Sequence, residues 1–185
     1  MEIKNISFGE YLALDSQEEY NFFMRYSNAL NKPTDLFGIG DMTEKSFGIV
    51  KDLQFDISQG MTWNQIIEYI MKFTGKTYGE ITALPLTKFC PGWKYIQDEI
   101  ERITEIEMAV LSYTPTPEEK EAGIDNLDIL GVYLQIRKIA LTLHYSIEQV
   151  KAMRYDEAFL ELVTQKKLSE YESELNKVYR NKHAR

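Results

Sequence analysis

Three carboxylates at helical spacing are the first residues of this chain that could do chemistry. Asp98, Glu101 and Glu105 follow one another at intervals of three and four residues, so a helix places them on one face. Carboxylates that gather in a pocket and shift each other's pKa can serve an enzyme. Di-iron bundles also hold carboxylates on helices, but they require Glu-x-x-His pairs, which this sequence does not contain. We therefore interpret the three side chains as a solvated acidic face.

The single cysteine and the two histidines add no catalytic or metal-binding pattern. Cys90 lies between apolar residues and a Pro-Gly turn, which predicts a buried and inert thiol. His144 precedes a helix start and His183 lies in a basic tail, so neither has an orienting partner for general-base work. One cysteine and two distant histidines also cannot form a zinc site. From these residues we expect no enzyme, no bound metal and no cofactor.

Charge is unevenly distributed along the chain, whose net charge is −8. From Thr164 onward six Lys and Arg residues stand against three Glu, so this segment carries +3 and the preceding residues carry −11. An acidic body does not suit general nucleic-acid binding, which depends on neutralising phosphates. The basic tail can contact nucleic acid or an acidic partner, or it can simply complement the dipole of a last helix.

Composition and hydropathy indicate a globular protein without a membrane partner. Hydrophobic residues make up 44% of the sequence and charged residues 27%, which argues against wholesale disorder. The sequence has no apolar run long enough to span a bilayer, and it begins without the apolar core of a signal peptide. We expect a cytosolic protein, or a part of something that is assembled in a cytosol.

Capping boxes supply the clearest local signals for helix starts. In this pattern a Ser or Thr hydroxyl accepts a hydrogen bond from the backbone three residues on, where Glu or Gln reaches back. Most of the matches open a segment whose apolar residues keep helical spacing. The matching pairs are Ser7/Glu10, Ser16/Glu19, Thr62/Gln65, Thr77/Glu80, Thr116/Glu119 and Ser146/Gln149.

These helix starts, without any sustained period-two alternation, predict an all-α fold. We expect a multi-helix bundle of two loosely defined lobes, which comprise residues 1–90 and 91–185. A long helix should open the second lobe at about 93–113. A long amphipathic helix should close the chain at about 156–180.

Two segments lack a regular apolar pattern and are expected to be loops. The segment 84–93 contains prolines and a glycine, and it is the natural hinge between the two lobes. The segment 31–42 contains an isolated Gly-x-Gly and is expected to be a flexible connection. No internal repeat is apparent.

The stretch from Leu143 to Val163 predicts a short helix, a tight turn and then the long terminal helix. Ser146 caps the short helix, while Asp156 and Glu157 suit the positive N-terminus of the long one. An amphipathic terminal helix packs on its own domain or docks in the groove of a partner. The expected apolar stripe consists of Phe159, Leu160, Val163, Leu168, Tyr171, Leu175 and Val178. The residues expected to contact a partner are Tyr155, Phe159, Tyr171, Lys177, Tyr179 and Arg180.

The same stretch resembles the C-terminal part of small helical proteins of tailed bacteriophages, above all the tail-assembly chaperone group. A compact helical unit of the form iA…y-s-x-e-e-V…m-x-y-x-e recurs in that group. The residues that match this form are Ile139, Ala140, Tyr145, Ser146, Glu148, Val150, Met153, Tyr155 and Glu157. The resemblance implies a non-enzymatic protein of phage morphogenesis, located in the virion or in the host cytoplasm. Such a protein chaperones a tail component or forms a connector or head–tail part of the particle.

Three functions are open at this point. The first is a phage assembly or virion structural protein that acts through protein–protein contacts, as a homo-oligomer or in a complex with other phage structural proteins. The second is a cytosolic helical adaptor or regulator whose basic C-terminal tail contacts nucleic acid or an acidic partner. The third is an enzyme whose site, around Asp98, Glu101 and Glu105, is completed by oligomerisation.

Overall fold

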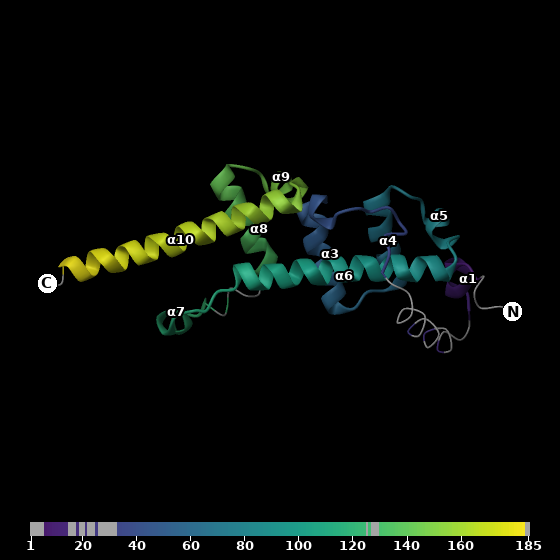
Figure 1. Cartoon of the computed structure of the whole chain (residues 1–185), viewed down its shortest axis with the longest axis horizontal. Coiled ribbons are helices and arrows are strands. Elements are labelled where there is room, and N and C mark those ends of the chain that lie inside the picture. The colour runs from purple at the N-terminus through teal and green to yellow at the C-terminus, as the bar shows by residue number, and fades with distance from the viewer. Residues whose placement is uncertain are drawn as a thin grey trace. The chain divides into compact units, whose positions relative to one another are not determined.

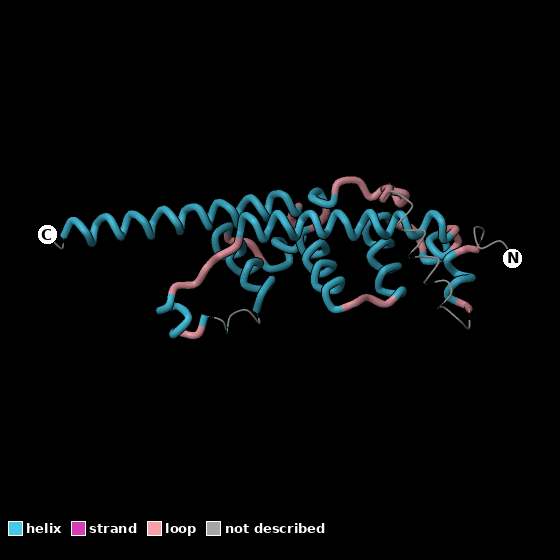
Figure 2. The backbone as a smooth tube through the Cα atoms, turned by 60° about the horizontal axis from the view of Figure 1, so that its bottom comes forward, coloured by secondary structure: helices cyan, strands magenta, loops and turns pink. Residues whose placement is uncertain are grey.

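The computed structural model describes residues 6–14, 18, 21, 25, 33–124, 126 and 130–183. Throughout this part of the chain the regular elements are helices and none is a strand, which confirms the predicted all-α class (Figures 1 and 2). Contacts divide the chain into two compact units. The first unit comprises Met1–Met42 and Asp52–Ile103, and the second comprises Thr43–Lys51 and Thr104–Arg185.

The first unit has a core rich in aromatic rings. Phe8 stacks on Phe89 with 3.7 Å between the ring centroids, and Trp63 meets both rings edge-on. Its helices are α1 (Phe8–Leu12), α4 (Trp63–Thr74), α5 (Tyr78–Thr82), the end of α3 (Phe47–Gln59) and the larger part of α6 (Leu86–Leu111). A short 3-10 helix, η2 (Met42–Glu44), lies where the chain passes into the second unit.

The second unit ends with the longest helix of the described chain. It combines the start of α3 and the end of α6 with α7 (Pro117–Glu121), α8 (Gly131–Leu143), α9 (Ile147–Ala152) and α10 (Tyr155–His183). Its core contains Phe47, Ile139, Val150 and Ala158, all fully buried. Helix α10 confirms the long terminal helix predicted at about 156–180.

Capping boxes were predicted well. Five of the six predicted boxes lie in the described residues, and in all five the hydroxyl and the Glu or Gln side chain make the reciprocal hydrogen bonds. The sixth, Ser16/Glu19, lies outside the described residues. Each of these five helix starts therefore has a cap that is complete within four residues.

Helix α6 begins at Leu86, well before the predicted start near Trp93. The expected hinge at 84–93 is therefore wrong. A Pro-Gly pair within this segment favours a turn, but tertiary contacts override that preference, since Leu86 N–H donates to the carbonyl of Ile6 at 3.0 Å. The expected lobes, 1–90 and 91–185, divide the chain at a different point of α6 from the contact boundary at residue 103.

The segment 33–42 packs into the core of the first unit instead of forming a flexible connection. The carboxylate of Asp35 accepts hydrogen bonds from the backbone N–H groups of Ile39 at 2.8 Å and Gly40 at 2.7 Å. Phe37 and Ile39 are only 3% and 2% exposed. The glycines give this segment a tight path, and its apolar side chains supply the packing that the sequence pattern did not reveal.

One structural motif occurs once in each unit. Each copy joins the start of one helix, marked by the tripeptide Ser-Phe-Gly at 7–9 and at 46–48, to a short capped helix followed by a long helix. In the first unit these elements are α1, α5 and α6, and in the second they are α3, α9 and α10. The structure therefore contains a repeated motif although no repeat is apparent in the sequence.

Reciprocal backbone hydrogen bonds join the two helix starts in the first copy of this motif. Phe8 N–H donates to the carbonyl of Leu84 at 2.8 Å, and Leu86 N–H donates to the carbonyl of Ile6 at 3.0 Å. The first N–H groups of a helix have no acceptor within that helix. Each start therefore supplies the acceptor that the other one lacks.

The second copy repeats this exchange at equivalent positions. Phe47 N–H donates to the carbonyl of Met153, and Tyr155 N–H donates to the carbonyl of Lys45, both at 2.8 Å. The hydroxyl of Ser46 also donates to the carbonyl of Lys151 at 2.6 Å. Two backbone hydrogen bonds thus join the starts of α3 and α10, and the Ser46 hydroxyl joins the start of α3 to α9.

A glycine in each copy allows the short helix to approach the neighbouring helix start. A Cβ at Gly9 would lie 3.3 Å from the Cβ of Thr82, and a Cβ at Gly48 would lie 2.9 Å from the Cβ of Lys151. Thr82 and Lys151 occupy the same position relative to their capping boxes. The approach is so close in the second copy that any side chain at Gly48 would displace α9.

Substitution of Gly48 by Ala should lower the free energy of unfolding by about 1–3 kcal/mol, because the new methyl group meets the Cβ of Lys151. Gly79→Ala is the matched control, since Gly79 lies in α5 with open space around it. The control should be neutral or stabilising by up to about 1 kcal/mol. Equilibrium urea unfolding measures both, and equal effects at the two positions would contradict the assigned contact.

Candidate partner-binding surface

A buried ion pair holds the first turn of α10 in the second unit. Lys51 Nζ donates to Glu107 Oε1, and the hydroxyl of Tyr155 donates to the same oxygen at 2.6 Å. Lys51 is 3% exposed, so burial lowers its pKa while the nearby carboxylate of Glu107 opposes that shift. The ring of Phe47 lies against the ammonium group, 5.7 Å from Nζ to the ring centroid. One charged centre therefore joins the ends of α3, α6 and α10.

Lys166 gives α10 a second attachment point. Its Nζ donates to the carbonyl of Val110 at 2.8 Å and to the carbonyl of Ser112 at 2.7 Å. These carbonyls end α6, where the last carbonyl groups of a helix lack donors and the dipole favours a cation. Ala158 and Leu162 are buried between the two attachments. The part of α10 from Tyr155 to Lys166 is thereby packed on its own unit.

Beyond Lys166 the helix is exposed. Every residue from Lys167 to Lys182 is exposed, except for the half-buried Leu175. In Figures 1 and 2 these turns, which are yellow in Figure 1, run on to the C-terminus past α8 and α9. Large apolar side chains on this helix include Leu160 at 65% exposure, Leu168 at 57%, Tyr171 at 64% and Val178 at 48%.

We call the set formed by Leu160, Leu168, Tyr171, Leu175 and Val178 the α10 stripe. Its members lie on one side of the helix and share an apolar character. Single exposed apolar residues are common, but several of them on one face of a helix indicate an interaction site. The stripe is therefore the candidate partner-binding surface.

The predicted partner-binding residues divide between the exposed and the packed parts of α10. Those on the exposed part are Tyr171, Lys177, Tyr179 and Arg180. Tyr155 is 3% exposed and its hydroxyl is bound to Glu107, so it has almost no surface to offer. Phe159 is half-buried and stacks on Tyr155 with 5.9 Å between ring centroids. These two residues position the helix, and the partner-binding hypothesis stays with the other four.

The residues first considered for catalysis are exposed, form a surface ion pair or end a helix. Asp98 is half-buried and forms an ion pair with Lys94, and Glu101 and Glu105 are exposed. His144 ends α8 in a left-handed conformation with φ 57°, where its backbone N–H donates to the carbonyl of Ala140. Within the described ranges, no three His, Cys, Asp or Glu side chains are placed to hold a metal ion.

A cavity of about 870 Å³ lies in the second unit beside α8 and α10. Leu134, Leu162, Lys166 and Glu174 are among its lining residues, so apolar and charged groups are mixed. Lys166 is already bound to backbone carbonyls. This combination gives no recognisable ligand chemistry, and we assign no ligand to the cavity.

Comparison with protein families, with curated proteins and with solved structures finds no match to this chain. Among the helices of the described residues, none is both long enough and apolar enough to cross a membrane.

The stability losses on removing the two members of the buried ion pair should be strongly non-additive. We expect Lys51→Met or Glu107→Gln alone to lower the free energy of unfolding by about 3–5 kcal/mol, because each leaves an unpaired buried charge. The double variant should lose much less than the sum of the two single losses. Urea unfolding of the four proteins measures this coupling.

Lys94→Met is the control for this cycle, because the Lys94–Asp98 pair is 40% and 34% exposed. It should cost less than about 1 kcal/mol. Strictly additive losses at Lys51 and Glu107 would show that the two side chains act independently, contrary to the observed pair.

The thiol of Cys90 should resist modification in the folded protein. Burial raises its pKa to about 12, so at pH 8 nearly all of it is protonated, and only the thiolate is reactive. We expect reaction with a disulfide reagent to be slower than in the unfolded chain by about a thousandfold or more. The rate should still rise with pH above pH 9 instead of levelling off there. Equal rates in folded and unfolded protein would refute the burial of this thiol.

Proposed function

We propose that this protein is a non-enzymatic assembly protein of the tailed-bacteriophage type, which acts through protein–protein contacts made by the α10 stripe. It serves as a tail-assembly chaperone or as a connector or head–tail component, in the virion or in the host cytoplasm. Its partners are other structural proteins of the particle or further copies of itself. The observation that supports this proposal is the exposed apolar row on α10.

The energetics of the stripe favour its use as a contact. Burying an exposed large apolar side chain stabilises by about 1.5–3 kcal/mol, and the stripe offers four exposed side chains and the half-buried Leu175 on one helix face. Association costs about 4–15 kcal/mol in lost freedom of motion. The stripe can therefore supply most of the free energy of a specific complex, provided that the partner presents a matching apolar surface.

The residues that carry the resemblance to tail-assembly chaperones build the base from which this helix extends. Ile139 and Val150 are fully buried, and Tyr155 is 3% exposed. They belong to α8, α9 and the first turn of α10. Both lines of support for an assembly role thus concern the same part of the second unit.

Nucleic-acid binding through the basic tail is the second candidate function. Lys177, Arg180 and Lys182 are exposed on the last turns of α10. Lys177 is, however, paired with Glu174 at 2.6 Å, and the rest of the chain is acidic. Electrostatic repulsion of phosphates by that acidic body weakens this function relative to protein contacts.

Quantitative mass spectrometry of purified particles and of infected-cell lysates tests the proposal. A fixed stoichiometry in the particle identifies a structural component, and presence in the lysate with exclusion from the particle identifies a chaperone or scaffold. In either case Leu168→Glu should lower particle yield or incorporation, because a carboxylate in the stripe opposes burial. Unchanged particles from cells that lack the protein would refute the proposal.

Leu141→Glu is the matched control for this experiment. Leu141 lies on α8 of the same unit and is 67% exposed, but it is not part of the stripe. The same substitution there should leave particle yield unchanged. Equal losses for both variants would indicate a general effect of surface charge and would remove the stripe from the proposal.

A further inference from the structure

Helix α10 has two apolar faces, and its own unit uses one of them. The buried face consists of Tyr155, Ala158, Leu162 and Gln165. At about 100° per residue, the α10 stripe spans an arc of roughly 80° whose centre is about 140° around the helix from the buried face. The stripe is therefore a second face that the described part of the unit leaves in contact with solvent.

The first unit covers the beginning of the equivalent face of its own long helix. Because α6 and α10 occupy the same place in the repeated motif, their residues can be matched from the helix starts. Pro91 then corresponds to Leu160, and Tyr95 corresponds to Thr164. Pro91 is buried, whereas Leu160 is 65% exposed.

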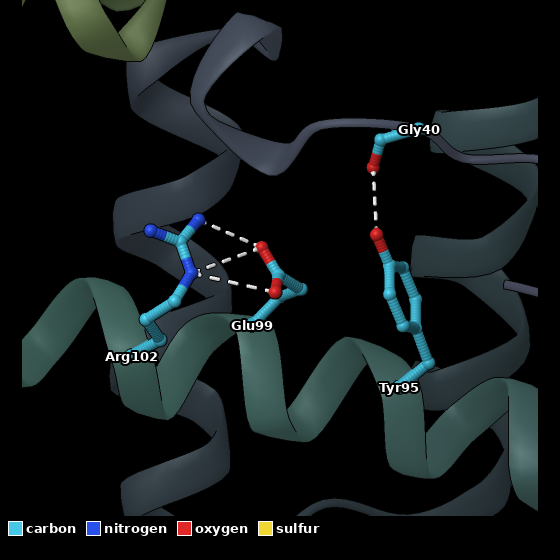
Figure 3. Close-up of polar contacts among 4 residues, drawn as sticks. All are labelled: Gly40, Tyr95, Glu99 and Arg102. Carbon is cyan, nitrogen blue, oxygen red and sulfur yellow. Dashed lines mark hydrogen bonds and ion pairs between the residues drawn. The ribbon is translucent and has the colours of Figure 1, made fainter. Parts of the chain in front are cut away.

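The cover of the first unit is the segment 33–40. The hydroxyl of Tyr95 donates to the carbonyl of Gly40 at 3.3 Å, as Figure 3 shows. The ring of Phe37 lies so close to Gly92 that a Cβ there would be 2.6 Å from the ring. Around Pro91 and Tyr95 this face of α6 is thus covered, whereas the equivalent part of α10, at Leu160 and Thr164, is exposed.

Further along the two helices, the residue types differ in a way that points to a partner of α10. Glu99 and Arg102 of α6 form an ion pair at 2.8 Å (Figure 3), and the equivalent residues of α10 are Leu168 and Tyr171. A charged pair suits a solvated position. Exposed Leu and Tyr at the same positions suit a position that another molecule covers.

We propose that the α10 stripe is covered by α10 of a second copy of this chain, in antiparallel orientation about a two-fold axis near Ser169. This inference rests on the proposed function, since it names the partner of the same surface. A two-fold axis makes the contact closed and self-complementary, because each residue pair occurs twice.

A single antiparallel register matches the apolar residues of both copies. An axis near Ser169 places Leu160 opposite Val178 of the second copy, and it places Leu168 opposite Tyr171. Thr164 and Leu175 form the layer between these two. Residues that are separated by three or four positions share a helix face, so the three layers stack along one seam.

The charges of α10 are complementary in this same register. On the side of the helix that carries the stripe, Glu157 lies in the first turn and Lys182 lies in the last turn. The axis near Ser169 places Glu157 opposite Lys182 of the second copy. A parallel pair would instead bring the two Glu157 side chains together and the two Lys182 side chains together, which is unfavourable.

Sedimentation equilibrium of the full chain over a wide concentration range tests the contact. We expect a reversible monomer–dimer equilibrium. Leu168→Glu should raise the dissociation constant by at least about a hundredfold, because the substitution acts in both copies. Leu141→Glu should leave the dissociation constant unchanged. A strictly monomeric wild-type chain would overturn the inference.

Charge reversal and cysteine pairing test the orientation. Glu157→Lys and Lys182→Glu should each weaken the dimer, and the double variant should restore it. An oxidised mixture of Leu160→Cys and Val178→Cys proteins should give mainly the mixed disulfide, with the buried Cys90 silent. Cross-linking of Leu160→Cys to itself, or a double charge reversal that fails to restore the dimer, would overturn the antiparallel register.

These outcomes separate the inference from the proposed function. A monomeric chain whose association with particles is nevertheless lost in Leu168→Glu overturns the inference and supports the proposed function. If the chain forms an antiparallel dimer but the phage assembles normally without it, the inference is supported and the proposed function is overturned. Salt-sensitive binding of DNA by a monomer, lost on removal of the last turns of α10, counts against both.

Discussion

The first backbone N–H groups of a helix have no acceptor in that helix, and this constraint organises both units. Each unit meets it by the same exchange, in which two helix starts lie antiparallel and accept each other's hydrogen bonds. The exchange requires a close approach, which explains the glycine after Phe8 and after Phe47. It also fixes the first turns of α6 and α10, and so the direction in which each long helix leaves its own motif.

The buried Lys51–Glu107 pair also fixes the rotation of α10 about its own axis. A buried ion pair is often no more stabilising than apolar residues of similar size, so stability alone does not account for it. Its effect is on register, because Lys51 and the Tyr155 hydroxyl share one carboxylate oxygen. A slip of α10 by one residue would turn Tyr155 away and leave the charges poorly paired. The pair therefore selects which face of α10 is buried and which face, the stripe, is turned to solvent.

Local signals in the sequence were sufficient for the helix class and for the capped helix starts, because a capping box is complete within four residues. They failed at Leu86 and at segment 33–42, where the deciding contacts come from residues far away in the chain. The repeated motif could not be recognised in the sequence for a related reason. The segments 77–86 and 146–155 share one identical residue, the alanine, although their caps and buried aliphatic positions correspond. Backbone hydrogen bonds define the motif, and many side chains are compatible with them. The exposed half of the candidate site could be predicted from apolar spacing, whereas the burial of Tyr155 depends on Lys51 and Glu107, which are distant in sequence.

The stability of the exposed end of α10 gives a further reason to expect a covering partner. Short helical segments without tertiary contacts are marginal in water, because nucleation is costly and tertiary packing normally supplies most of the stability of a helix. Ion pairs within the helix, such as Lys167–Glu170 and Glu174–Lys177, contribute only about 0.2–0.5 kcal/mol each. The first of these also has its cation on the N-terminal side, the less favourable order with respect to the helix dipole. A partner that buries the stripe would supply the missing packing, so assembly and the ordering of these last turns should be thermodynamically coupled.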